Sequence, residues 1–275
     1  AWSWRDDVRL FGKTALARAY PRFVSLWREP SWVVFDVLLP LLPVLALGTL
    51  VHAANAPREY LGFLALGGAM AALWLNVLWG TALQLFWEKE SGNLAYYLMS
   101  PAPRLAVLLG IALGGLGPAV VRAAAIFVVA TLALGASYQV EQPLLVAAVF
   151  GATLVAVYAL GALLASLYLL WTREAWHVNQ LLQEPLYLVT GLYVPVRYLG
   201  LGVAAVALLV PLTPGLDAQR QLLVPGGHAH GLLPVGVELG ILLAEALLFL
   251  FASPRALHRL EERGRRDGQL IVRGR

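Results

Sequence analysis

Cysteine is absent from the 275 residues, and charged residues are scarce at 13%. Without cysteine the chain has no disulfide framework, no thiol nucleophile and no thiolate metal ligand. A soluble domain carries about 25% charged and roughly 45–50% apolar residues, whereas 60% of this chain is hydrophobic. So few polar side chains cannot cover a water-soluble globule, which excludes a soluble enzyme. Disordered chains are poor in apolar and aromatic residues, so disorder is excluded as well.

Motifs for covalent chemistry are also missing. The fragment Gly12-Lys13-Thr14 matches the end of a phosphate-binding loop, but Asp7 stands where that loop needs its first glycine. The closest histidines, His228 and His230, lie in a glycine- and proline-rich stretch typical of a solvated loop. We therefore expect no catalytic residue, no metal site and no cofactor in this chain.

Long apolar runs dominate what is present. A helix needs about 20 mostly apolar residues to cross roughly 30 Å of hydrocarbon. Six runs meet this length, at residues 31–51, 61–87, 104–134, 144–170, 176–196 and 232–252. A further run at 199–212 is too short for a span. We predict an all-α integral membrane protein with six transmembrane helices, in which this short run is re-entrant and lies between spans five and six.

Basic residues are distributed unevenly over the two sides of this topology. Sixteen of them fall on the side of both termini, seven in the tail 253–275 alone, while the other side has Arg58, Arg197 and Arg220. Cytoplasmic segments carry the excess of lysine and arginine. Both termini are therefore predicted to be cytoplasmic, in a multi-pass protein of the plasma (cell inner) membrane, and residues 31–252 form the bundle.

Residues 1–28 predict an amphipathic helix that precedes the bundle. One face of this helix holds Trp4, Val8, Phe11, Ala15 and Ala19. A helix of this kind lies in the membrane interface, with its apolar face toward the acyl chains. The alternative is a solvated helix packed on a partner, and the tryptophans near the boundary favour the membrane surface.

Ionisable side chains inside the spans are costly, and they usually face a bundle interior, a cavity or a partner. Arg122 lies in the third span, and Glu238 and Glu245 share a face of the sixth. We predict that one of these glutamates forms an intramembrane ion pair with Arg122. Such a pair is either structural or part of a substrate or proton path. The structural role is favoured, because a proton relay needs a longer chain of such groups.

Span five is the most polar of the six, and Pro185 interrupts its helical hydrogen bonding. Amides in spans often serve as hydrogen bonds between helices. Here polarity and a helix break coincide, which favours a translocation path. The predicted path residues of spans two and five are Asn76, Gln84, Asn179, Gln183, Glu184 and Tyr187.

Residues 86–104, FWEKESGNLAYYLMSPAPR, resemble the cytoplasmic loop of ABC-2 type transporter permeases. In that family a charged cluster, a small residue and an apolar stretch lead into Ser-Pro, and the loop includes a coupling helix that docks on the ATP-binding subunit. The resemblance assigns this role to Glu88, Lys89, Glu90, Ser91, Gly92, Asn93 and Leu94. We expect the charged residues to enter water here, followed by an apolar strip that a partner covers.

A second segment, 190–223, is similar to the region of the same family that follows span five. The residues that match this region are Pro195, Pro211, Thr213, Asp217 and Arg220. In the family this region is a re-entrant helical hairpin on the outer side. The chain departs from the pattern at Tyr198-Leu199-Gly200, where many members have Leu-Pro, and this difference bears on the shape of the hairpin.

The resemblance covers nearly the whole chain and implies the permease subunit of an ATP-driven exporter. It implies a second permease chain, identical or related, and separate cytoplasmic ATPase subunits that hold ATP and Mg. The amides and aromatic rings of span five suit an amphipathic small molecule or lipid as cargo. The arginine-rich ends are explained by topology and anionic lipid rather than by nucleic acid.

Two other function classes compete with this interpretation. An ion- or proton-coupled secondary transporter would be favoured by inverted repeats, and spans one to three show no convincing similarity to spans four to six. A membrane-embedded enzyme lacks a credible set of catalytic groups.

Overall fold

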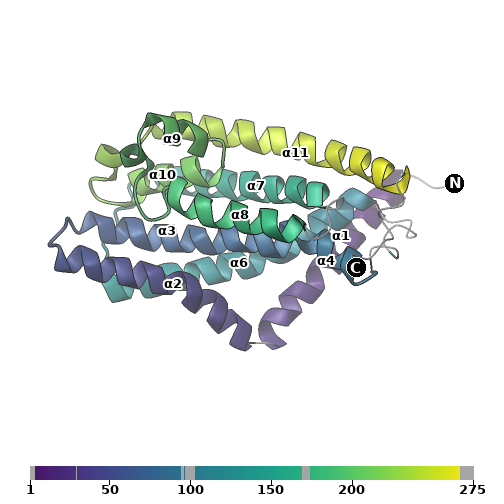
Figure 1. The fold of residues 1–275 in the computed structure, drawn as a ribbon, viewed down its shortest axis with the longest axis horizontal. Coiled ribbons are helices and arrows are strands. Elements are labelled where there is room, and N and C mark those ends of the chain that lie inside the picture. The colour runs from purple at the N-terminus through teal and green to yellow at the C-terminus, as the bar shows by residue number, and fades with distance from the viewer. Residues whose placement is uncertain (1–3, 29, 94–95, 97–102, 169–173, 267–275) are drawn as a thin grey trace.

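The structure is a computed structural model that describes residues 4–28, 30–93, 96, 103–168 and 174–266. All of the regular structure in these ranges is helical, as the apolar runs predict. Most of the long helices lie alongside one another and follow the longest axis of the molecule, whereas the first helix runs obliquely to them (Figure 1).

In chain order, the elements are α1 (Trp4–Arg28), α2 (Pro30–Ala53), α3 (Glu59–Leu75), the π-helix η1 (Asn76–Ala82), α4 (Gln84–Glu90), α6 (Arg104–Leu134), α7 (Pro143–Tyr168), α8 (Glu174–Val189), the 3₁₀-helix η2 (Val196–Leu199), α9 (Leu201–Ala207), α10 (Leu212–Leu223), the 3₁₀-helix η3 (Gly227–His230) and α11 (Val235–Arg266).

Five helices within the described residues are long and apolar enough to cross a membrane. These candidate spans are Val34–Ala53, Glu59–Glu90, Leu105–Leu134, Pro143–Tyr168 and Val235–Arg259. They correspond to the predicted spans one to four and six. The bent pair α9 and α10 would make a sixth if it counted as one span.

The predicted fifth span, 176–196, is shorter in the structure than the sequence indicates. It corresponds to α8, which has 16 residues and is therefore about 24 Å long, less than the roughly 30 Å of a bilayer core. The chain leaves the helix at Thr190, and Gly191 takes a φ of +84°. The apolar residues beyond this glycine belong to the turn that leads into η2.

The segment formed by α3, η1 and α4 is the central element of the bundle. Of the residues in its most apolar stretch, 83% are buried, against 22% for α2 and for α11. A helix that is hydrophobic all round is a buried one. Its large side chains Phe63, Trp74 and Leu78 pack with Leu212 and Leu216 of α10 in the main hydrophobic cluster.

Helix α1 packs against α6 through small residues. Ala15 and Ala19 of α1 are buried, and they lie against Gly110 and Gly114 of α6. Small residues four apart on both helices let the two backbones approach closely. The apolar face predicted to contact lipid therefore contacts α6 at these two alanines, because the absent side chains of the glycines leave a groove for them.

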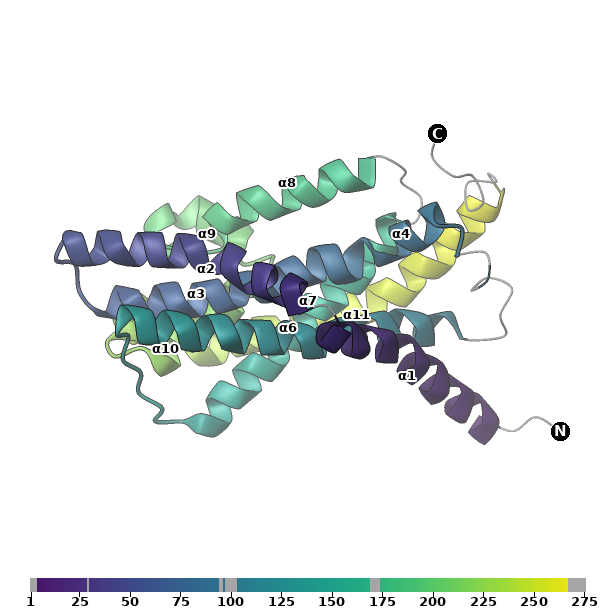
Figure 2. The same ribbon diagram turned by 90° about the horizontal axis from the view of Figure 1, so that it is seen from below.

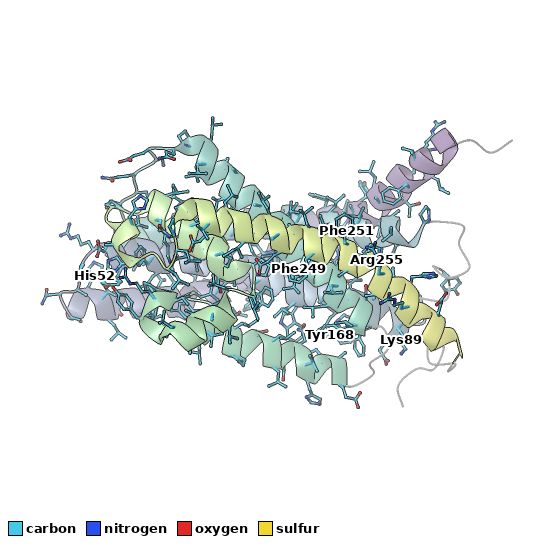
Figure 3. All side chains as sticks on the ribbon, turned by 90° about the horizontal axis from the view of Figure 1, so that it is seen from above. His52, Lys89, Tyr168, Phe249, Phe251 and Arg255 are labelled. Carbon is cyan, nitrogen blue, oxygen red and sulfur yellow. The ribbon has the colours of Figure 1, made fainter. Side chains whose placement is uncertain are left out.

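Different helices and turns lie at the two ends of the molecule. At one end, which we call the terminal end, α1 begins, α4 ends and α11 ends; at the other, the hairpin end, lie α9, α10 and the turn after α2 (Figures 1 and 2). Figure 3 shows Lys89 at the terminal end and His52 at the hairpin end. Helices α9 and α10 are bent by 107° relative to each other, which fits either a broken span or a re-entrant loop.

Candidate functional site

A cavity of about 840 Å³ opens where six elements meet, and it is the main candidate site in the part of the chain that the structure describes. Its walls combine arginine, aspartate, amide and aromatic side chains with apolar ones. The lining residues are Arg22, Asp36, Leu39, Pro40, Pro43, Ala71, Ala72, Leu75, Asn76, Trp79, Gly80, Gly114, Gly115, Pro118, Arg122, Gln183, Tyr187 and Tyr193.

An ion pair between α2 and α6 lies in the cavity wall. Arg122 donates from Nη1 to Oδ2 of Asp36 and from Nε to the carbonyl oxygen of Pro118, at 3.3 Å. The sequence predicted Glu238 or Glu245 as the partner, and this prediction is wrong. Both glutamates lie on α11, which packs mainly on α7 and α10, so their helix is separated from this side of α6.

The ion pair lies near the start of the apolar run of α2 rather than at its middle. Asp36 is the third residue of the apolar run Val34–Ala53, whose 20 residues just match the hydrocarbon thickness at 1.5 Å per residue. Arg122 contacts Asp36 and so shares its depth.

The π-helix places the Asn76 amide next to this ion pair. With its oxygen toward Nη2 of Arg122, at 2.8 Å, the amide donates to the Gly115 carbonyl at 3.1 Å and to the Tyr158 hydroxyl at 3.0 Å. In this orientation the amide oxygen accepts one hydrogen bond and the amide nitrogen donates two. Single-turn π-helices inside α-helices often occur at functional sites, and Asn76, the first residue of η1, lines the cavity.

A second arginine reaches the cavity from α1. Arg22 donates to the side-chain oxygen of Gln84, which in turn donates to Glu88 at 2.9 Å. Glu88 also accepts from Arg18 in an ion pair. Burial, together with the charge of Arg18, lowers the pKa of Arg22 to about 10, so this guanidinium is still protonated at neutral pH.

Three of the six predicted path residues line the cavity, namely Asn76, Gln183 and Tyr187. Gln183 and Tyr187 are four residues apart and share one face of α8. Gln183 accepts from the indole Nε1 of Trp79 at 2.6 Å and donates to Glu184 at 3.1 Å.

The other three predicted path residues do not line the cavity. Glu184 is exposed on the neighbouring face of α8. Gln84 lies behind Arg22. Asn179 is fully buried, and its amide atoms have no hydrogen-bond partner among the described residues.

Four polar or aromatic residues that line the cavity, Arg22, Asp36, Trp79 and Tyr193, are missing from both the predicted path and the predicted ion pair. A lone carboxylate inside the first apolar run was a usable signal for Asp36. No sequence signal identifies Arg22, because α1 looks like a peripheral helix until its packing on α6 is known.

The predicted coupling segment begins inside the bundle and not in water. Glu88 and Lys89 are 7% and 3% exposed, and the carboxylate of Glu88 holds α1 through Arg18. Exposure begins at the turn after α4, where Ser91 and Asn93 are exposed and Gly92 takes a φ of +79°. The expectation that the charged cluster enters water is therefore wrong for Glu88 and Lys89, and Leu94 lies outside the described residues.

Arg220 connects the predicted hairpin to the central helix. It is fully buried on α10 and donates to the carbonyl oxygens of Phe63 at 2.8 Å and of Leu192 at 2.7 Å, and also to Gly191. Its guanidinium lies 5.3 Å from the centroid of the Phe63 ring. One buried side chain thus fixes both α3 and the turn after α8.

The other predicted hairpin residues lie around the same turn. Asp217 is buried and accepts from the backbone N–H of Leu232 at 2.7 Å, which attaches α10 to the segment before α11. Pro195 and Pro211 directly precede η2 and α10, and Thr213 is fully buried. These residues therefore shape the hairpin end rather than line the cavity.

The two glutamates of α11 have separate environments. Glu238 accepts from the Gln221 amide at 3.1 Å near the hairpin end. Glu245 is buried, and its carboxylate oxygens have no hydrogen-bond partner among the described residues. Among all the residues that the structure describes, no group of three or more acidic or histidine side chains is arranged to hold a metal ion.

A family model described as ABC-2 type transporter matches residues 18–224, which include the cavity, the turn after α4 and the hairpin. No curated protein matches the chain.

Proposed function

The chain belongs to the ABC-2 type transporter family, and from that premise we propose that it is the permease subunit of an ATP-driven exporter. Its cavity would form part of the path for an amphipathic small molecule or lipid. The observation that carries the proposal is the cavity itself: polar groups of α2, α6, η1 and α8 converge in one space whose other walls are apolar, a combination that suits a molecule with a polar head and an apolar body.

Energy for transport would come from partner subunits. The family's membrane domain works with ATPases on separate chains, so ATP and Mg²⁺ would be bound there. A second permease chain, identical or related, would complete the transporter.

The contacts of α4 suggest how a movement outside the membrane would reach the cavity. Gln84 and Glu88 are one turn apart and contact Arg22 and Arg18 of α1. Arg22 lines the cavity. A partner that moves the turn at Ser91–Asn93 would therefore shift α4 and, through α1, one of the two arginines of the cavity.

The exposed turn after α4 provides a test of ATPase docking. We expect the double variant Ser91→Arg/Asn93→Arg to weaken co-purification with the ATPase subunit about tenfold, because two long cations fill a contact surface. Charge reversal at Glu88 is a poorer test, since it breaks the ion pair with Arg18 and so disturbs the fold.

A matched control is available at the hairpin end, where Gln139 and Gln142 are also exposed. The variant Gln139→Arg/Gln142→Arg should assemble like the parent. Equal assembly of both double variants would show that the turn after α4 is not the docking segment.

Orientation can be tested directly because the chain has no cysteine. Ser137 is exposed at the hairpin end and Asn93 at the terminal end. We expect Ser137→Cys to react with a membrane-impermeant maleimide in intact cells, and Asn93→Cys to react only after permeabilisation, because the basic segments stay cytoplasmic. The cysteine-free parent is the blank, and the reverse pattern would refute the proposed topology.

A further inference from the structure

We propose that the hairpin end contains a proton-binding site, in which Glu238 of α11 holds one proton and donates it to Asp217 of α10. The shared proton attaches α11 to α10. The inference goes beyond the proposed function, because it concerns the hairpin end and needs neither the cavity nor an ATPase.

The Gln221 side chain lies between the two carboxyl groups and cannot satisfy both. Its Nε2 atom is 2.7 Å from the carbonyl oxygen of Leu233, 3.1 Å from Oδ2 of Asp217 and 3.1 Å from Oε2 of Glu238. An amide nitrogen has two hydrogens, so three acceptors compete for two donors. The carbonyl oxygen is the nearest of the three, which leaves the two carboxyl groups with one amide hydrogen between them.

An unpartnered oxygen of Glu238 marks the place of the missing donor. The residue is fully buried, and its Oε1 atom has no hydrogen-bond partner among the described residues. The side chains of Glu238 and Asp217 are within hydrogen-bonding reach of each other. Two ionised carboxylates only accept, so a proton on Glu238 is what makes this bond. Asp217 stays ionised, since its Oδ2 also accepts from the backbone N–H of Leu232 at 2.7 Å.

The charges around the pair also call for one proton. Arg220, the one basic residue of α10, is buried and interacts electrostatically with Asp217. Helix α7, the main neighbour of α11, contains no Asp, Glu, Lys, Arg or His. Of the two histidines of η3, His230 pairs with Glu59 at 2.8 Å and the other is exposed. Glu245 lies two turns further along α11. One buried cation thus faces two carboxyl groups, and because an uncompensated buried charge is unfavourable, one carboxyl group is neutral.

The proton joins two helices because the carboxyl groups come from different ones. Its loss places two like charges in one buried site, which is unfavourable, and repels α11 from α10. In the unfolded chain both carboxyl groups are ionised at neutral pH. The folded chain therefore holds one proton more than the unfolded chain, so its stability falls as the pH rises.

Infrared spectroscopy of the purified chain detects the proton directly. A protonated carboxyl group has a carbonyl stretching band that an ionised one lacks, and the band moves to lower frequency in heavy water. Glu245 is buried as well, so the spectra are recorded in the Glu245→Gln background. We expect such a band at neutral pH, lost in Glu238→Gln and kept in Glu141→Gln, which changes an exposed glutamate. Absence of the band from this background, or its survival in Glu238→Gln, would overturn the proposal.

Asp217→Asn separates a shared proton from a proton held by burial alone. An amide oxygen accepts more weakly than a carboxylate. The Glu238 band therefore moves to higher frequency if Glu238 keeps its proton, and is lost if the remaining carboxyl group ionises against Arg220. An unchanged band would show that Glu238 does not donate to Asp217.

Thermal unfolding in detergent measures the link to stability. Raising the pH from about 6 to about 9 should lower the melting temperature of the parent more than that of Glu238→Gln, because glutamine has no proton to lose. For one proton, the folding equilibrium constant falls by at most about tenfold per pH unit. Identical pH profiles of the two proteins would contradict the proposal.

Discussion

Replacing Arg220 by methionine is expected to destabilise the folded chain by about 3 kcal/mol, because each buried acceptor that loses its donor costs about 1–3 kcal/mol. Methionine fills much of the same volume but cannot donate. The carbonyl oxygens of Phe63, Gly191 and Leu192 then lose their donor in a buried site, and α10 loses its attachment to α3. Thermal unfolding of the purified protein, followed by circular dichroism, measures the loss.

Arg197→Met is the matched control for this prediction. Arg197 is exposed and donates to one carbonyl, that of Ala229, so its loss should cost less than about 1 kcal/mol. Equal unfolding temperatures of the two variants would contradict the role given to Arg220.

Gly67→Ala tests the same contact from the other side. A methyl group on Gly67 would overlap the carbonyl oxygen of Leu192 and approach Arg220. Gly67→Ala should therefore destabilise the folded chain, as Arg220→Met does.

Replacing Gly110 by leucine is expected to detach α1 from α6 and to abolish coupled transport. A carbon on Gly110 would lie 2.7 Å from the backbone oxygen of Ala15 and 2.6 Å from Cβ of Arg18. Backbone cannot yield as a flexible side chain does, and a leucine side chain overpacks the contact further. With α1 displaced, Arg18 and Arg22 lose Glu88 and Gln84, so α4 no longer acts on the cavity.

Two measurements check the detachment of α1. ATP-driven transport by the reconstituted complex should fall at least tenfold, and trypsin should cleave faster at the basic residues of α1, while helical content stays near the parent value. Gly151→Leu is the control, since nothing lies within 4 Å of a carbon on Gly151 of α7. Normal transport by Gly110→Leu would show that this contact is dispensable.

The amides of the cavity show what sequence reasoning reaches. A polar group in an apolar helix must find a partner, so Asn76 and Gln183 were recognisable as interior residues before their contacts were known. Glu184 and Asn179 carried the same signal and do not line the cavity. Composition shows that a helix is polar, but only packing decides which of its faces meets the other helices.

Local features of the sequence were sufficient to predict the class of protein, the approximate bounds of five spans, the break before α10 and the family. All of these depend on local hydropathy, on glycine and proline, or on short motifs, and they need no knowledge of neighbours. The partner of Arg122, the docking of α1 and the depth of the cavity depend instead on how the helices pack. Asp36 and Arg122 are 86 residues apart in the sequence, so no local pattern predicts their contact. The sequence of a 31-residue helix such as α6 also does not indicate which of its residues lie in hydrocarbon. The contact with Asp36 shows only that Arg122 lies level with the start of the apolar run of α2.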